Sequence, residues 1–557
     1  MIDITRFAIL GPSSPLARQP STMRHPILKP LYVALAFLLF SHIGPSALRA
    51  ENAAYSAAIS SIQEAEAKAI VDALADDIFE GREAGSRGGH ASGGFIIDRL
   101  KKLAVQPAGT TQKFYQVFGA QYRNILVLHE GTDPELKQEH ILVTAHYDHV
   151  GYGTSRNSFG PTGFIHNGAD DNASGTAALM ELIEAFATSE LTTRRSILFI
   201  FFDAEEKGLL GSRHWVNNPT VPLESIPIMI NVDMVGRLRD NTINIHGTRS
   251  AAGLRQLISR HNHDPDLRLD FTWKNKANSD HYPFYERNIP FVMLHTGLHD
   301  DYHRPSDDAD KVNTAGIERA SRLLFSLTHE FANRDTIPNF RNASRGESEW
   351  QRRQRARVME PAPPRIGLRW NPDDDQAIQG DGLRLTDVVP GYAAQRAGLQ
   401  SGDRILELAG EKVTSGEAFR GQVLWAKNPV KVVFMRDGQE EPQELTVELD
   451  GTPVRLGISF RTDDAWPGVA VVNRVTPGSP AARAGVQLHD HIYRVADKPF
   501  QDREEFLALV NGEAAPLSML VERQGKLMTV SLDVPPLSGK GETGVTDSPS
   551  AIGSSAE

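Results

Sequence analysis

The stretch SILFIFFDAEE (196–206) joins a run of large apolar residues to three acidic residues that follow it directly. The run Ser196–Phe202 has the length and composition of a strand buried on both faces, which is typical of a parallel sheet. Two further runs of this kind, Ile141–Ala145 and Ile228–Val232, lead into the polar motifs AHYDHVG and NVDMVG. Ligands bind outside the carboxyl ends of the strands in open α/β sheets, so these polar side chains are expected to converge at one edge.

Two more motifs supply residues of the same chemistry, NGADDNASG (167–175) and DYHRPSDD (301–308). The chain contains no cysteine, so any metal must be held by histidine and carboxylate side chains. Zinc accepts both donor types readily. His146 and Asp148 are two residues apart at a strand end and therefore point to the same side. Of the adjacent pair Glu205 and Glu206, one can bind metal while its neighbour reaches a bound water as general base.

The region 60–335 alternates strand-like and helix-like segments. Within it, Ser174–Phe186 places Leu179, Leu182, Ile183 and Phe186 on one helical face. Such alternation predicts an α/β domain with three layers and a mixed, mostly parallel sheet. The stretch 336–362 breaks the pattern and is rich in arginine, so we interpret it as a linker that is a solvated surface or a short helix.

Composition and charge narrow the functional classes. The chain has 557 residues and a net charge of −11, which argues against nucleic acid as a partner because phosphate binding needs clustered Lys and Arg. Near the N-terminus, three basic residues precede the apolar run Leu31–Phe40 and then small residues. This pattern predicts a signal peptide over 1–50, with Met23 as an alternative start, and export to the periplasm or the extracellular space. Retention of the segment as a membrane anchor is the alternative.

The C-terminal third contains an internal repeat. VVPGYAAQRAGLQSGDRIL (388–406) matches VTPGSPAARAGVQLHDHIY (475–493), and the short segments RIGLRW and RLGISF lie upstream of the two copies. The repeat resembles the PDZ domains of bacterial proteases, which predicts two small β+α domains at 363–450 and 453–536. The tail 537–557 is rich in Ser, Gly and Thr and is expected to be disordered.

The PDZ resemblance implies capture of peptide C-termini by strand addition at a sheet edge. The carboxylate-binding turns would lie at Ile366–Leu368 and Leu456–Ile458. His489 stands in the second copy where Gly402 stands in the first, a position that disfavours histidine if it needs a positive φ. The alternative is that one or both domains only pack against the preceding domain.

The motifs of the first domain resemble the dizinc aminopeptidase family, whose relatives include glutamate carboxypeptidases and glutaminyl cyclases. The resemblance covers about 75–330, including LADDIFEGREAGSRGG (74–89). It implies two zinc ions, a metal-bound hydroxide that attacks the peptide carbonyl, Glu205 as general base and Asp148 as the residue that orients His146. One zinc would take His146, Asp171 and Asp233, and the other Asp171, Glu206 and His303.

Several neighbouring residues compete for these roles. The family pattern selects Asp171 over Asp170, and His303 over His295 and His299. Asp280 and His281, in SDHYPFYERNIPFVML (279–294), are expected near the substrate pocket or in structural hydrogen bonds. We interpret His149, His166 and His214 as ordinary surface or packed histidines. The loop 151–166 is either a rim of the substrate cleft or a plain flexible connection.

Three hypotheses follow. The leading one is an exported zinc exopeptidase, an aminopeptidase acting on peptide substrates. A carboxypeptidase or a glutaminyl-cyclase-like enzyme on the same fold is the nearest alternative, because the metal motifs are shared. A peptide-binding scaffold with an inactive peptidase domain is the alternative from another class, motivated by the two PDZ-like repeats.

Overall fold

The computed structural model describes residues 45–119, 121–359, 364–375, 378 and 381–534. Of the predicted signal peptide at 1–50, residues 1–44 lie outside the described ones, as do the predicted disordered tail at 537–557 and the end of the predicted linker, 360–362. Among the described helices, none combines the length and the apolar character that crossing a bilayer requires.

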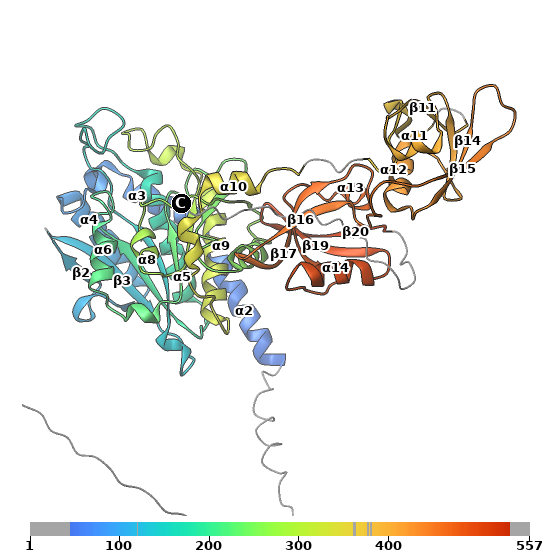
Figure 1. Cartoon of the computed structure of the whole chain (residues 1–557). Coiled ribbons are helices and arrows are strands. Elements are labelled where there is room, and N and C mark those ends of the chain that lie inside the picture. Colours follow the sequence, from blue (N-terminus) through green and yellow to red (C-terminus); the bar gives the residue numbers. More distant parts are fainter. Residues whose placement is uncertain (1–44, 120, 360–363, 376–377, 379–380, 535–557) are drawn as a thin grey trace, which may run out of the picture. The chain divides into compact units, whose positions relative to one another are not determined.

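The first part of the chain forms a mixed sheet with helices on both faces (Figure 1). The strand order is β1-β3-β5-β4-β6-β9-β7-β8, and β2 pairs with β3. The strands are β1 (Gln106–Pro107), β2 (Tyr115–Phe118), β3 (Tyr122–His129), β4 (His140–His146), β5 (Ser196–Phe202), β6 (Met229–Val232), β7 (Thr242–His246), β8 (Arg268–Phe271) and β9 (Phe291–His295). The helices are α2 (Pro45–Ser61), α3 (Glu64–Leu74), α4 (Arg87–Lys102), α5 (Gly175–Thr188), α6 (Leu210–Asn217), α7 (Leu254–Arg260), α8 (Tyr282–Tyr285) and α9 (Thr314–Asn333).

The four central strands β5, β4, β6 and β9 run parallel, whereas β3 and β7 flank them antiparallel. The three strands predicted from the apolar runs are therefore neighbours with one direction, and the fold class is confirmed as a mixed α/β sheet. Because parallel strands end at the same edge, the polar residues that follow β4, β5 and β6 are brought together there.

Alternate residues of each central strand enter two different cores. In β5, Ile197, Phe199 and Phe201 pack with α3, α4, α5 and α9, while the intervening residues pack with α6 and α8 on the other face. This arrangement makes three layers, helix, sheet and helix. It explains why the central strands are apolar without alternation, since both of their faces are buried.

The C-terminal region forms two further antiparallel sheets, each with short helices. The first contains β10 (Leu368–Trp370), β11 (Leu383–Val388), β12 (Arg404–Leu408), β13 (Glu411–Lys412), β14 (Val430–Met435) and β15 (Gln443–Val447), with α11 (Ala393–Ala397) and α12 (Gly416–Trp425). The second contains β16 (Ile458–Asp463), β17 (Trp466–Val475), β18 (His491–Val495), β19 (Leu517–Arg523) and β20 (Lys526–Leu532), with α13 (Pro480–Arg483) and α14 (Arg503–Gly512). Gly402 and His489 both have positive φ, at 92° and 70°, so the histidine does occupy a left-handed position.

The described part of the arginine-rich stretch contains a 3-10 turn, Asn342–Gly346, and a short α-helix, α10 (Glu349–Arg355), which begins at a capping box formed by Ser348 and Gln351. The stretch is not a free connection. Glu349 accepts hydrogen bonds from the hydroxyl of Thr272 and the main-chain N–H of Trp273. Arg355 pairs with Asp463 of β16 at 2.7 Å.

Contacts within the described part of the chain also join the second antiparallel sheet to the α/β domain. Trp273 packs in one apolar cluster with Trp466 and its neighbours on β17 and β18. The guanidinium of Arg249 lies 3.8 Å from the ring centre of Trp273 and 4.8 Å from that of Trp466. It also pairs with Glu347 and Asp463, at 2.5 and 2.9 Å. The second repeat therefore contacts the preceding domain through these residues.

Candidate metal centre

Two groups of histidine and carboxylate side chains lie at the carboxyl edge of the central strands. The first comprises His146 from the end of β4, Glu205 after β5 and Asp233 after β6. The second comprises His149, Asp171, Glu206 and His303. Within each group the donor atoms lie within 4.8 Å of one another. The structure thus brings together the five predicted ligands and Glu205, although 157 positions separate His146 from His303 in the numbering of the chain.

Asp171 lies between the two groups. One of its carboxylate oxygens is 3.4 Å from Nε2 of His146, and the other is 3.1 Å from Nε2 of His303. The Nε2 atom of His146 is also 3.4 Å from Asp233 Oδ1, and that of His303 is 3.1 Å from Glu206 Oε2. Donors bound to one zinc at about 2.0 Å in tetrahedral geometry lie about 3.3 Å apart, so these spacings fit a pair of zinc ions bridged by Asp171.

In the two candidate ligand histidines, His146 and His303, the nitrogen remote from the carboxylates lies beside a main-chain carbonyl. Nδ1 of His146 lies 3.2 Å from the carbonyl oxygen of Asp148, and Nδ1 of His303 lies 2.8 Å from that of Asn157. With Nδ1–H donating to a carbonyl, each imidazole presents its unprotonated Nε2 to the metal side. The loop 151–166 therefore helps to form the site, because it supplies Asn157.

Asp148 acts differently from the sequence-based expectation. Its carboxylate is 3.8 Å from Nδ1 of His146, beyond hydrogen-bond distance, and His146 is oriented by the Asp148 main chain instead. The two carboxylate oxygens accept the main-chain N–H groups of Glu205 and Glu206, at 3.0 and 3.3 Å. A buried carboxylate thus fixes the turn that carries both glutamates.

The backbone around Asp171 is held by Asp307, which the sequence did not single out. Asp307 Oδ2 accepts the N–H groups of Asp170 and Asp171, at 3.0 and 3.1 Å, and Oδ1 pairs with Arg237 at 2.7 Å. The neighbouring Asp170 turns away from the metal side, because its oxygens bind the N–H of Gly236 and face His299 at 3.2 Å. This geometry separates the two adjacent aspartates into one structural and one site residue.

The buried Arg82 provides positive charge behind the cluster. It donates to the carbonyl oxygens of Leu74, Tyr147, Asn167 and Gly168. Burial lowers the pKa of Arg82 to about 10, and the carboxylates of Asp171, Asp148, Asp307 and Glu206 oppose that shift. The sequence indicated the segment 74–89 by resemblance but gave no role to this residue.

Burial and neighbouring charges set the ionisation of the site. Burial raises the pKa of Glu205 well above its ordinary value, with Glu206 adding to the shift and His146 opposing it. Burial raises the pKa of Glu206, but the neighbouring imidazoles of His149 and His303 lower it by more, so its pKa lies below the ordinary value. Burial also raises the pKa of Asp280 to about 7 and lowers that of His281 to about 3.

The remaining histidines divide clearly. Nδ1 of His166 donates to the main-chain carbonyl of Phe164, and its Nε2 lies 2.8 Å from the hydroxyl of Ser158. The ring of His214 stacks on that of Phe118, so both histidines are packed residues. His295 accepts the N–H of Gly297. His149 departs from its interpretation as an ordinary histidine, since its Nδ1 is 2.9 Å from Glu206 Oε1. Only its position next to Asp148 in AHYDHVG could have signalled this.

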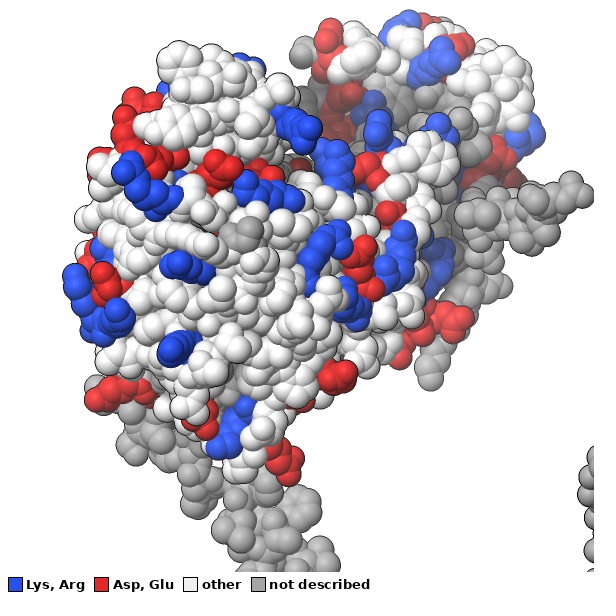
Figure 2. Space-filling view, turned by 90° about the vertical axis from the view of Figure 1, so that its left-hand side faces the viewer, with Lys and Arg blue, Asp and Glu red and all other residues white. Residues whose placement is uncertain are grey.

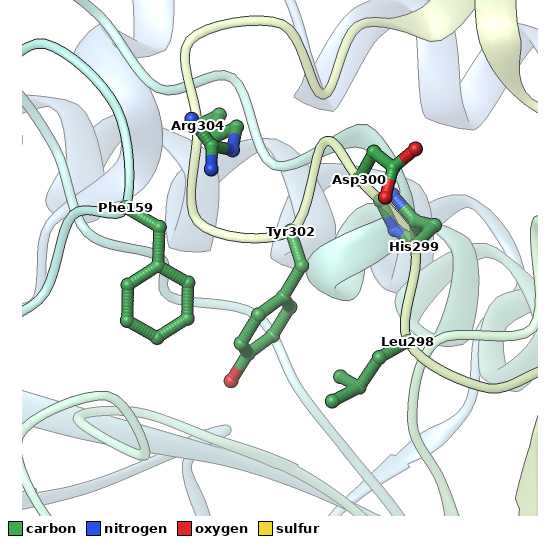
Figure 3. A pocket seen from close by; sticks show the side chains of 6 residues that line it. All are labelled: Phe159, Leu298, His299, Asp300, Tyr302 and Arg304. Atoms are coloured by element: carbon green, nitrogen blue, oxygen red, sulfur yellow. The ribbon is translucent and has the colours of Figure 1, made fainter.

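A pocket of about 480 Å³ adjoins the second group and is lined by Phe159, Leu298, His299, Asp300, Tyr302 and Arg304 (Figure 3). The side chains of Phe159, Tyr302 and Leu298 point into the same space, and Tyr302 lies between the other two. The Tyr302 ring stacks on His303 at 4.0 Å between centres. The part of the pocket wall that adjoins His303 is therefore an aromatic ring, that of Tyr302.

The surface carries charges of both signs. Figure 2 shows basic and acidic side chains interspersed among uncharged ones on the face that it presents. Charges of both signs therefore share this face.

Comparison with known proteins identifies the domains. Residues 124–328 match peptidase family M28, and residues 384–421 and 454–534 match PDZ domains. The chain therefore contains an M28 peptidase domain followed by two PDZ domains, which confirms the resemblance drawn from the motifs.

The relatives found are distant. Aminopeptidase YwaD of Bacillus subtilis (strain 168) is 27% identical over 208 residues, which cover 36% of this chain and 42% of that protein. Leupeptin-inactivating enzyme 1 of Streptomyces exfoliatus is 27% identical over 263 residues, which cover 45% of this chain and 53% of that protein. The chain thus spans about half the length of these curated relatives. The structure of BSAP, a zinc aminopeptidase from Bacillus subtilis, aligns with a TM-score of 0.41 at 17% identity, covering 50% of this chain and 98% of that one.

Proposed function

We propose that this protein is an exported zinc-dependent exopeptidase, an aminopeptidase that removes N-terminal residues with apolar side chains from peptides. The observation that supports the proposal most strongly is the pair of donor groups joined by Asp171, with Glu205 beside the first group. The aminopeptidase names of the relatives agree with it. His146, Asp171 and Asp233 would hold one zinc, and Asp171, Glu206 and His303 the other.

The zinc pair, when bound, polarises the peptide carbonyl and makes a water molecule more acidic. Glu205 takes the proton of that water and passes it to the leaving amine, as a general base and then a general acid. Burial raises its pKa, which suits a group that must both accept and release a proton. Asp148 keeps Glu205 in place by accepting its main-chain N–H.

The pocket of Figure 3 supports the proposed preference for apolar side chains. Phe159, Tyr302 and Leu298 offer apolar surface, and the contact between Tyr302 and His303 places that surface beside the second donor group. A leucine or phenylalanine side chain would gain free energy by leaving water there. Asp300 and Arg304 add polar groups to the same wall.

The test is a mass-spectrometric digest of mixed peptides by the zinc-loaded chain and by its Glu205→Gln variant. We expect stepwise loss of N-terminal residues, fastest for leucine and phenylalanine, and no loss with the variant although it retains zinc. Loss from the C-terminus would identify a carboxypeptidase, for which Arg304 offers a cation. Cyclisation of N-terminal glutamine, or binding without cleavage, would favour the cyclase or the scaffold hypothesis.

The proposal of export rests on the basic and apolar residues before position 50. N-terminal sequencing of the chain recovered outside the cytoplasm is its test. A new N-terminus near position 51 would support a cleaved signal, and an intact apolar run in a membrane fraction would support an anchor. The PDZ domains are proposed to bind peptides at the free edges of β10 and β16.

A further inference from the structure

We propose that His149 is a fourth protein ligand of the zinc held by Asp171, Glu206 and His303. The inference concerns this chain's own residues at the dizinc site and does not depend on which end of a peptide is removed. It makes the two zinc sites unequal, because the second would have four protein donors and the first only three, namely His146, Asp171 and Asp233.

The position of His149 supports ligation. Its Nδ1 lies 2.9 Å from Glu206 Oε1 and 3.9 Å from Asp171 Oδ2, and its donor atom joins those of His303, Glu206 and Asp171 within one group. Its ring is about perpendicular to that of His303, with the centres 5.5 Å apart. Two imidazoles and two carboxylates around one point form a donor set that zinc accepts in tetrahedral coordination.

The polar surroundings of His149 are confined to the candidate metal group. The ring is 1% exposed, and its Nε2 has no hydrogen-bond partner among the residues that the structure describes. Nδ1 therefore makes the polar contacts of the side chain, and they are all with residues of the metal group. Gly168 gives the ring its space, because a Cβ atom at that position would collide with it.

Unequal sites have a chemical consequence. A zinc with four protein donors is closed, as in structural sites, whereas a zinc with three keeps a position for water. Glu205 belongs to the group of His146 and Asp233, on the three-donor side. The site that is open to water is then the one that carries the general base, and the four-donor site retains its zinc more firmly.

X-ray absorption at the zinc edge tests the inference on the full chain loaded with two zinc ions. Three histidines over two ions give an average of about 1.5 imidazoles per zinc, and His146 with His303 alone give about 1.0. We expect about 1.5 for the unchanged chain and about 1.0 for His149→Gln. His166→Gln is the matched control, a buried histidine outside the metal groups, and should leave the value near 1.5.

Zinc retention is a second readout that does not use activity. During dialysis against a chelator, the unchanged chain should lose one zinc early and hold the other, while His149→Gln should lose both at similar chelator concentrations. Loss of an outer-shell partner alone lowers zinc affinity about 10–100-fold, so weaker retention supports the inference only together with a lower imidazole number. Circular dichroism checks that the variants fold. If His149→Gln does not fold, His149→Asn replaces it in both measurements.

Two results would overturn the inference. An average near 1.0 in the unchanged chain, not lowered by His149→Gln, would show that His149 only donates a hydrogen bond to Glu206. A folded chain that binds no zinc would remove the dizinc site itself. Cleavage of peptides from the other end would contradict the proposed function and leave His149 as a ligand.

Discussion

At the scale of single residues, Asp148 holds the turn that carries Glu205, the proposed general base. Its carboxylate holds the main-chain N–H groups of Glu205 and Glu206, so Asp148→Ala should free the turn between β5 and α6. We expect kcat to fall about 10–100-fold while zinc content stays at two, because supporting partners of metal sites have effects of this size. Asp148→Asn keeps one oxygen acceptor and should lose less. Equal kcat for the alanine variant and the unchanged chain would contradict this role.

Glu181 on α5 makes stability depend on pH. Burial raises its pKa from 4.5 to about 7, so the folded chain binds its proton more tightly than the unfolded chain does. The free energy of unfolding should therefore fall as pH rises from about 4.5 to 7 through this group. Glu181→Gln should raise stability at pH 8 by about 1–3 kcal/mol and change it little at pH 4.

Urea unfolding at the two pH values measures the effect of Glu181→Gln. Glu135→Gln, at an exposed position, is the control and should change stability at neither pH. A Glu181→Gln variant that gains as much at pH 4 as at pH 8 would show that the gain does not come from the buried charge.

The sequence predicted the candidate metal-binding side chains better than the residues that hold them in place. His146, Asp171, Glu205, Glu206, Asp233 and His303 stand in motifs with a recognisable order, and the structure brings them together. Asp307, Arg82 and His149 were missed because they act on groups far away in sequence. Asp307 holds the N–H of Asp171, and Arg82 holds carbonyls near Gly168, contacts that the fold alone creates.

At the scale of elements, the loop 151–166 sets the expected specificity. Phe159 lines the pocket, and its main-chain N–H donates to the carbonyl of His303 at 2.9 Å. Phe159→Ala removes apolar wall without removing that hydrogen bond. We expect kcat/KM for leucine substrates to fall about tenfold relative to alanine substrates, as for partial loss of one apolar contact surface.

Phe164→Ala provides a control from the same loop, because Phe164 is 60% exposed and does not line the pocket. It should leave the ratio of leucine to alanine rates unchanged. Equal losses on both substrates for Phe159→Ala would mean that the loop affects catalysis rather than side-chain selection.

Secondary-structure elements could be predicted from the sequence where burial on both faces requires an unbroken apolar run. β4, β5 and β6 are buried on both faces, so their apolar runs marked them within a residue or two. α10 was predicted only as one of two alternatives, because its seven residues bury none of their side chains and its capping box is a local signal. Short edge strands such as β1 and β8 carry no such run and were not predicted.

At the scale of the whole molecule, Arg249 links the peptidase domain to the second PDZ domain. It is 5% exposed and pairs with Glu347 and Asp463 between two tryptophan rings. Arg249→Met would remove one partner from each of two buried carboxylates, which keep Arg341 and Arg355, and we expect it to cost about 1.5–3 kcal/mol, as for loss of hydrogen bonds to charged groups. Arg255 makes a second such link to Glu522, at 2.7 Å.

Thermal unfolding followed by tryptophan fluorescence measures this change, because Trp273 and Trp466 are the rings beside Arg249. We expect Arg249→Met to unfold earlier and in two separate transitions. Arg384→Met is the control, since Arg384 and Asp437 form an exposed pair that contributes about 0–1 kcal/mol. A single unchanged transition for Arg249→Met would show that the link does not stabilise the chain.

The same contacts decide how a contribution of the PDZ domains to catalysis can be tested. A chain that ends at Asp335 lacks Glu347, Asp463 and Trp466, so Arg249 loses both carboxylates and Trp273 loses its apolar cover. We expect this shortened chain to melt at a lower temperature and to lose activity on short and long peptides alike. Its activity alone would therefore not separate peptide capture from stability. If it melts like the full chain and cleaves short peptides normally, the domain link is dispensable, and slower cleavage of long peptides alone would then assign peptide capture to the PDZ domains.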